Sequence, residues 1–210
     1  MGTRQFSLAI LATGSLLLLV NSIYPEKIQA QPELCSGDEN YEPASSTYKT
    51  IKLPEFGIEV DIPNNYRTMK RNDGSVEILH PDDFELFQCV ARGGTGGGGY
   101  YSEVIELVDK DNSISLREQA IQTIRYDYDP QGNPTPGSDN VNVLDYKQGD
   151  LSGYIAFATN SPAFNGVVFM GEIPGIEKIL TIYTKCDCDT TVEDLKGLLS
   201  RVRLIKNIIY

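Results

Sequence analysis

The sequence predicts an α+β sandwich built on a mostly antiparallel sheet. Three observations support this fold class. Several short segments alternate apolar and polar residues or are apolar throughout, as strands do. Two other segments begin with a helix capping box and continue with apolar residues at helical spacing. Along the chain the order is a run of strands, a helix, more strands and a final helix.

Residues 1–30 have the three parts of a secretory signal peptide: a basic start, an apolar stretch over residues 6–20 and an exit at Ile28-Gln29-Ala30. The apolar stretch is shorter than the roughly 18–20 residues that a transmembrane helix needs, and Gly14-Ser15 interrupts it. We therefore expect cleavage after Ala30, the alternative being an uncleaved membrane anchor. The expected mature protein is exported to a periplasm, a thylakoid lumen or the extracellular space, with no membrane insertion after cleavage.

After the signal peptide we expect an extended arm over residues 31–47 and a single α+β domain over residues 48–210. The arm is rich in acids, Pro and Ser, and only Leu34 and Tyr41 are sizeable apolar groups, so it cannot bury much surface. The remaining chain is long enough for one good hydrophobic core and short for two.

The first strand is expected over residues 56–62, where apolar residues alternate with Gly and acids. A hairpin follows, with strands over residues 66–71 and 75–80. The pair Asp73-Gly74 lies between them and favours a tight turn, because Gly tolerates a positive φ.

Residues 84–91 are apolar on both faces, which indicates an inner strand that carries Cys89. The glycine-rich residues 93–99 suggest a phosphate-binding loop, but such loops open into a helix, and here strand-like residues 102–109 follow. We therefore expect a flexible connection between strands.

Ser115-Leu116-Arg117-Glu118 is a capping box, which predicts the first helix of the domain. A long loop with three prolines is expected next, over residues 126–140. A second capping box, Thr190-x-x-Glu193, predicts the last helix, and residues 203–210 form a short strand or tail. Between that loop and the last helix, four strand-like segments cover residues 141–147, 151–159, 165–172 and 178–185.

The cysteines Cys35, Cys89, Cys186 and Cys188 all follow the expected cleavage point. An even number of cysteines in an oxidising compartment predicts two disulfides. A Cys186–Cys188 bond is the least favourable pairing, because residues two apart in an extended segment are poorly placed for it. We expect Cys35 and Cys89 each to pair with one cysteine of this segment. The alternative is that Cys186 and Cys188 form a redox-active or metal-binding pair.

The charge of the chain restricts its partners. The full chain has a net charge of −11, and loss of Arg4, Glu26 and Lys27 with the signal peptide makes it one unit more acidic. Such a protein repels phosphate backbones, so nucleic acid is not an expected partner, whereas cations or a basic protein surface are permitted. His80 is the only histidine, which makes a hydrolytic triad or a multi-histidine metal site improbable.

One segment has the start of a calcium loop. Asp127, Asp129 and Gly132 stand at the first, third and sixth positions of the pattern, where calcium-binding loops place oxygen ligands and a turn glycine. The twelfth position is Ser138, and Asp139 comes one residue late. A calcium site formed by Asp127, Asp129 and Asp139 is therefore a hypothesis, set against a plain acidic loop.

Three segments carry a resemblance to a known family. Phe56-Gly57-Ile58-Glu59-Val60-Asp61-Ile62-Pro63-Asn64-Asn65-Tyr66 resembles the opening strand of the PsbP-like family, residues 151–159 and 165–172 resemble its central hairpin, and residues 191–205 resemble its closing helix and strand. Tyr66 stands where Trp is usual. The resemblance implies an α-β-α sandwich around an antiparallel sheet, and an exported accessory or assembly factor of cyanobacteria or chloroplasts. It assigns no functional residue.

The function expected from the sequence is that of a secreted, non-catalytic binding or accessory domain with an unidentified protein partner. The resemblance adds an association with a photosystem, as an extrinsic or assembly factor. The alternatives are an exported thiol-redox or other enzyme that uses Cys186 and Cys188, and a calcium-dependent binding module.

Overall fold

The structure is a computed structural model that describes residues 33–35, 42–96, 101–128, 134–136, 140–158, 166–186 and 190–206, with the backbone alone at residues 125–128, 134–136 and 186. The chain divides into two compact units, Met1–Gln31 and Pro32–Tyr210, and the description concerns the second. The proposed signal peptide lies outside the described residues. No helix in the described part of the chain is long and apolar enough to cross a membrane.

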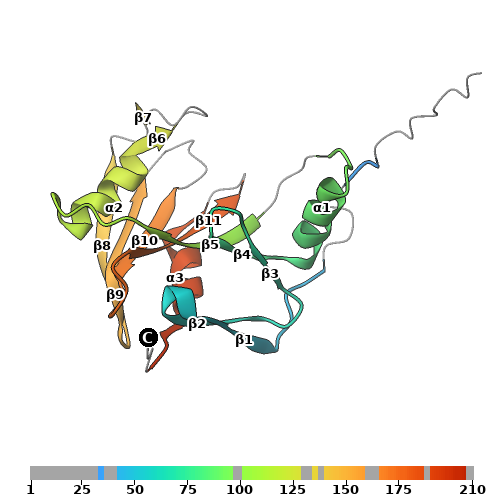
Figure 1. Ribbon diagram of the computed structural model, residues 1–210, viewed down its shortest axis with the longest axis horizontal. Coiled ribbons are helices and arrows are strands. Elements are labelled where there is room, and N and C mark those ends of the chain that lie inside the picture. Colours follow the sequence, from blue (N-terminus) through green and yellow to red (C-terminus); the bar gives the residue numbers. More distant parts are fainter. Residues whose placement is uncertain are drawn as a thin grey trace, which may run out of the picture. The chain divides into compact units, whose positions relative to one another are not determined.

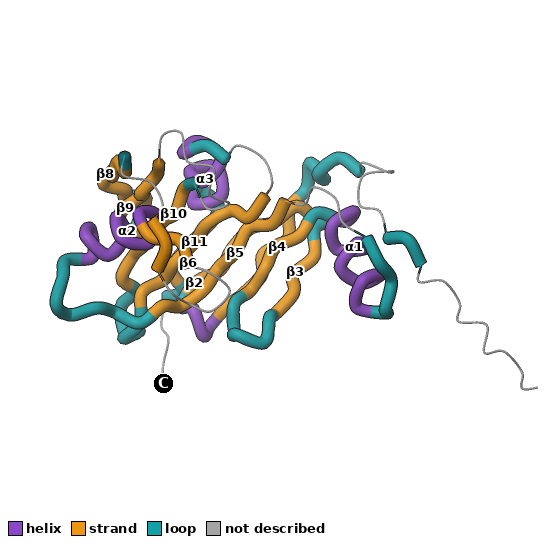
Figure 2. The backbone as a smooth tube through the Cα atoms, turned by 90° about the horizontal axis from the view of Figure 1, so that it is seen from above, coloured by secondary structure: helices purple, strands orange, loops and turns teal. Residues whose placement is uncertain are grey.

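A large, fully antiparallel sheet forms the body of the second unit (Figures 1 and 2). Every pair of neighbouring strands in it is antiparallel, which confirms the prediction of a mostly antiparallel sheet. The strands are, from one edge to the other, β3 (Arg67–Lys70), β4 (Val76–Leu79), β5 (Tyr101–Val108), β11 (Ile179–Cys186), β10 (Val167–Glu172), β9 (Leu151–Ala158) and β8 (Val141–Gln148).

A smaller sheet has the order β1 (Tyr48–Leu53), β2 (Ile58–Pro63) and β12 (Val202–Leu204). The predicted alternation holds in β2, where Ile58, Val60 and Ile62 are fully buried. A 3-10 turn, η1 (Pro54–Phe56), joins β1 to β2, and Gly57 ends it with a φ of 71°, a conformation that favours glycine.

Two helices cover opposite faces of the large sheet. On one face, Ala120 and Ile124 of α2 (Leu116–Arg125) pack with Ala156, Val168 and Met170 of the central strands. On the other face, the large core contains the apolar residues of α3 (Val192–Leu199), of the small sheet and of the alternate positions of β9, β10 and β11. Because side chains alternate across each strand, the two faces form two separate cores. The α+β class is therefore confirmed.

Residues 84–91 are helical, so the predicted inner strand is wrong. They belong to α1 (Pro81–Ala91), which lies at the β3–β4 end of the large sheet (Figure 2). Pro81 is at the first helical position and Asp82 and Asp83 occupy the first turn, where a missing N–H and negative charge are both favourable. One buried face of this helix contains Leu86 and Cys89, whereas Val90 of the same run is exposed.

The two capping predictions have different outcomes. The Glu118 N–H donates to Ser115 Oγ at 3.1 Å, as predicted for the start of α2. The box at α3 is one residue later than predicted: Thr191 Oγ1 accepts from the Asp194 N–H at 3.2 Å, and Asp194 Oδ2 accepts from the Thr191 N–H at 2.9 Å. A carboxylate at the third helical position suits this exchange, and Asp194 holds that position instead of Glu193.

The predicted loop over residues 126–140 contains a short antiparallel ladder. It is formed by β6 (Tyr126–Tyr128) and β7 (Pro134–Pro136), with Asp127 opposite Thr135. The end of the expected arm is also more ordered than predicted. The Ser45 N–H donates to Asn65 Oδ1 at 2.9 Å, and the Asn65 side chain donates to the Pro43 carbonyl at 2.9 Å. These bonds hold residues 43–45 against the turn after β2.

Candidate functional site

The strongest candidate site is a cleft between the start of β5, the helix α3 and the small sheet. Its volume is about 640 Å³, which lies within the range of ligand pockets. We call it the Glu103 cleft. Its lining residues are Tyr48, Asp61, Tyr101, Glu103, Glu193, Asp194, Gly197, Ser200 and Arg201.

Glu103 gives the cleft its most unusual feature. It lies on β5 and shares a face with Ile105, which belongs to the large core, so Glu103 as a whole is only 5% exposed. Oε1 accepts from Arg201 Nη2 at 2.9 Å, whereas Oε2 is buried and accepts no hydrogen bond. Burial raises the pKa of Glu103, and the neighbouring Arg201 opposes that shift.

Thr184 on β11 lies directly opposite Glu103 in the β5–β11 ladder. Its Oγ1 is buried and has no hydrogen-bond partner either. Buried polar atoms are nearly always hydrogen-bonded in folded proteins, and exceptions call for an explanation such as a bound water, an ion or a functional role. Two such atoms at paired positions beside one cleft identify this end of the sheet as a candidate site.

Arg201 is positioned by the end of α3. Its Nε donates to the Gly197 carbonyl at 3.2 Å, and its own carbonyl accepts from the Asp61 N–H at 3.0 Å. These contacts hold the guanidinium between the helix and the small sheet, next to Glu103. The ion pair therefore joins residues that are 98 positions apart in the chain.

Two tyrosines contribute rings to the cleft. Tyr101 begins β5 and is partly buried, and its pKa is raised by burial and by the negative charges of Glu103 and Asp194. Tyr48 begins β1 and is 56% exposed. The cleft thus combines aromatic surface with carboxylates.

The other acids of the cleft already have partners. Arg203 donates to both Asp61 oxygens, with Nη2 2.8 Å from Oδ1, and these bonds lower the pKa of Asp61 to about 2. Lys196 Nζ lies 2.9 Å from Glu193 Oε1. The Asp194 carboxylate caps α3.

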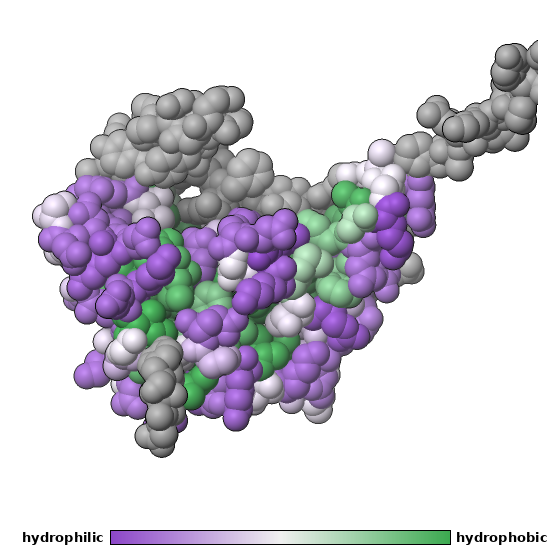
Figure 3. Space-filling view, in the orientation of Figure 1, coloured by the Kyte–Doolittle hydropathy of each residue, from purple (hydrophilic) through white to green (hydrophobic). Residues whose placement is uncertain are grey.

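A second cleft, of about 610 Å³, lies beside the β8–β9 turn and β12. Its lining mixes basic residues such as Lys52 and Lys206 with Glu59 and Asp150, and it contains none of the unpartnered buried polar atoms of the described residues. A third surface is apolar: in Figure 3 green side chains gather around α1, where Val90 is 44% exposed. Neither surface has polar groups that define a ligand as closely as those of the Glu103 cleft.

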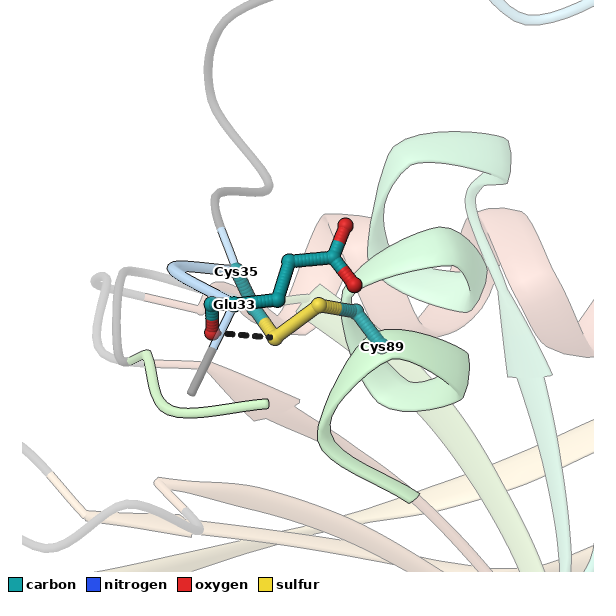
Figure 4. Close-up of a disulfide and its surroundings, with 3 residues drawn as sticks. All are labelled: Glu33, Cys35 and Cys89. Atoms are coloured by element: carbon teal, nitrogen blue, oxygen red, sulfur yellow. Dashed lines mark hydrogen bonds between the residues drawn. A yellow bond between two sulfur atoms is a disulfide. The ribbon is translucent and has the colours of Figure 1, made fainter. Parts of the chain in front are cut away.

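The expected cysteine pairing is wrong. Cys35 is bonded to Cys89, with 5.8 Å between their Cα atoms (Figure 4). The expectation failed because it placed Cys89 on an inner strand of the sheet, whereas Cys89 lies on α1, away from β11. The side chain of Cys186 and the whole of Cys188 lie outside the described residues, so a second disulfide stays a prediction.

The start of the glycine-rich segment is packed against this disulfide. Thr95 exchanges backbone hydrogen bonds of 2.8 Å with Glu33 and Cys35. A Cβ atom on Gly94 would lie 2.3 Å from Cys35 Sγ, and one on Gly96 would lie 2.1 Å from the Cys35 carbonyl oxygen. Residues 94–96 therefore lie in close contact with Cys35, and the predicted flexibility of the connection stays a prediction. Residues 97–99 lie outside the described residues.

The other candidate residues are placed as follows. Asp127 lies in β6 with its side chain undescribed, and Asp129 and Asp139 lie outside the described residues, so the calcium site stays a prediction. His80 caps α1: its Nδ1 accepts from the Asp82 N–H at 3.3 Å, and its Nε2 bonds the Glu42 carbonyl. Among the described residues, no group of three or more His, Cys, Asp or Glu side chains could hold a metal ion.

Sequence reasoning missed the Glu103 cleft. One signal was present: Glu103 alternates with Ile105 and Leu107, so a carboxylate stands on the apolar face of a strand. No comparable sequence signal marks its partner Arg201, because an arginine in the polar turn after a helix is expected to be exposed.

Comparisons with known proteins assign no family. No protein-family model matches the chain, and no curated protein matches it. The Glu103 cleft, together with the fold, therefore carries the functional argument.

Proposed function

We propose that the protein is an exported, non-catalytic binding or accessory protein that holds a protein partner at the Glu103 cleft. The signal-peptide pattern of residues 1–30 and a disulfide between Cys35 and Cys89 support export, because disulfides persist in oxidising compartments. The acidic chain favours a basic partner surface.

The proposal includes a PsbP-like α-β-α sandwich. The placement of α2 on one face of an antiparallel sheet and α3 on the other supports it. Through that resemblance we extend the proposal to an accessory role at a photosystem, as an extrinsic or assembly factor. This part of the proposal rests on the sequence pattern and the layer order together.

The single observation that carries the proposal is the half-paired carboxylate of Glu103. A buried carboxylate in which one oxygen has no hydrogen-bond partner lowers the free energy of unfolding, because the hydration that the oxygen loses on folding is not replaced. A bound partner that donates a hydrogen bond to Oε2 would recover that loss. A site that is poorly satisfied in the free protein and complete in a complex is what a binding protein needs.

Site-specific photo-crosslinking in the native source tests the proposal. Gly197 lines the cleft and has no atom within 4 Å of the position of an added Cβ, so a photoreactive residue fits there. Leu144 on β8 is 40% exposed, lies outside the cleft and serves as the matched control. We expect a discrete crosslinked partner from position 197 and none from position 144. Crosslinks from position 144 alone, or from neither position, would contradict the proposal.

A further inference from the structure

We infer that the Glu103 cleft receives an alkylammonium or guanidinium group, supplied by a lysine or arginine side chain of a protein partner. This inference rests on the proposed function and names the chemistry by which the partner is recognised. Three independent features of the cleft support it: its charge, its open acceptor and its aromatic surface.

The charge of the cleft favours a cation. Four carboxylates line it and Arg201 is the one cation in the lining. Arg203 and Lys196, which pair with Asp61 and Glu193, add two neighbouring positive charges. Arg203 also pairs with Glu59, so the lining residues and their ion-pair partners carry five negative and three positive charges, and this negative excess favours a cation.

The open acceptor of Glu103 can be used without breaking the existing ion pair. Arg201 holds Oε1, and Oε2 is buried without a hydrogen-bond partner, so an incoming N–H donor can bind Oε2 and keep the ion pair intact once the side chains that cover Oε2 move aside. Thr184 lies opposite, and its hydroxyl has no partner to lose. A buried, charge-assisted hydrogen bond is stronger than a neutral one, which makes Glu103 the expected anchor.

The tyrosines suit an organic cation better than a bare metal ion. Aromatic faces attract ammonium and guanidinium groups, and Tyr48 and Tyr101 both contribute to the cleft surface. The methylene stem of a lysine or arginine can pack on these rings while its charged end reaches the carboxylates. The size of the cleft, about 640 Å³, is also suited to a side chain rather than to a single ion.

The test is a titration of the isotope-labelled full domain with Nα-acetyl-lysine methylamide, followed by NMR. We expect saturable shifts of the backbone amides around Tyr101, Glu103 and Gly197. The Nε-acetylated compound and the norleucine analogue keep the stem without the charge, and both should bind at least tenfold more weakly. Equal binding of all three probes, or no shifts at these residues, would overturn the inference.

Variants separate binding from folding. Glu103→Gln removes the anchoring charge with little change in shape and should weaken probe binding about tenfold. Tyr48 is largely exposed, so Tyr48→Ala should leave the fold intact and weaken binding several-fold, whereas Tyr48→Phe should bind normally. Asp150→Asn, a carboxylate outside the cleft, is the matched control and should bind as the wild type does. Normal binding by both Glu103→Gln and Tyr48→Ala would refute the assignment.

The two proposals fail in different ways. A partner crosslinked at position 197, with no charge-dependent binding of the lysine probe, would overturn the ligand class and leave the binding function standing. Charge-dependent probe binding without a crosslinked protein would instead overturn the partner and keep the cation site, with a free amine as its ligand.

Discussion

Removal of the Cys35–Cys89 disulfide should destabilise the whole second unit rather than only the arm. The bond closes a loop with a sequence separation of 54 residues, and that loop contains β1, β2, β3 and β4. These strands belong to both sheets, so the crosslink restricts a part of the chain that must unfold globally. For a loop of this length the chain-entropy relation gives about 4 kcal/mol at 25 °C.

The assay is denaturant unfolding of the Cys35→Ala/Cys89→Ala variant beside the wild type. We expect a loss of about 3–4 kcal/mol in the free energy of unfolding, with the other two cysteines untouched. Unfolding of the wild type in reductant would also break the predicted second disulfide, so the double variant is the measurement that isolates the Cys35–Cys89 bond. A loss below about 1 kcal/mol would refute the reasoning, because it would mean that residues 33–35 detach without affecting the sheets.

Three further predictions concern the fold around the site. Gly153→Ala should lower the free energy of unfolding by about 1–3 kcal/mol in thermal unfolding, because the added Cβ would lie 2.2 Å from the Met170 carbonyl oxygen. Gly197→Ala should instead raise it by about 0.5–1 kcal/mol, because the position is helical and has open space for a Cβ. Equal effects of the two substitutions would contradict the packing argument. Thr191→Ala should cost about 1 kcal/mol by removing the cap of α3, measured by urea unfolding, and a neutral effect would mean that the capping box contributes nothing. The raised pKa of Glu103 means that the folded state binds the carboxyl proton more tightly than the unfolded state does. The stabilisation of the folded state by this proton is therefore complete below the unfolded pKa and is lost as pH rises through the folded pKa. Glu103→Gln should therefore gain stability relative to the wild type as pH rises above about 4.5, and parallel pH profiles of the two proteins would contradict this.

Local patterns predicted those elements whose structure depends on nearby residues. The alternation of residues 58–62 follows from one buried and one exposed strand face, and the Asp73-Gly74 turn has its glycine at a φ of 90°. The hairpin over β3 and β4 formed as predicted for the same reason. These features need only a few neighbouring residues to be specified.

The helix α1 shows where local pattern was misread. A short run that is apolar on most positions fits an inner strand or a buried helix, and periodicity alone cannot separate them. The deciding residues stand before the run: Pro81, Asp82 and Asp83 are unfavourable inside a sheet strand and favourable in the first turn of a helix. The error in α1 then produced the wrong partner for Cys89.

The candidate site depends on contacts between distant segments, which one sequence does not reveal. Glu103 and Arg201, 98 residues apart, meet because the end of α3 packs on the face of the sheet to which Glu103 belongs. Tyr48 and Asp61 join them from the small sheet. The composition of the chain indicated an acidic surface, but the position of the cleft required the tertiary arrangement.

The most direct test of the central claim is the affinity of the crosslinked partner, once purified, for the wild type and for Glu103→Gln. Surface plasmon resonance at fixed ionic strength gives both dissociation constants, with Asp150→Asn as the control. We predict at least tenfold weaker binding by Glu103→Gln and unchanged binding by Asp150→Asn. Equal affinity of all three proteins would show that the partner does not use the Glu103 cleft.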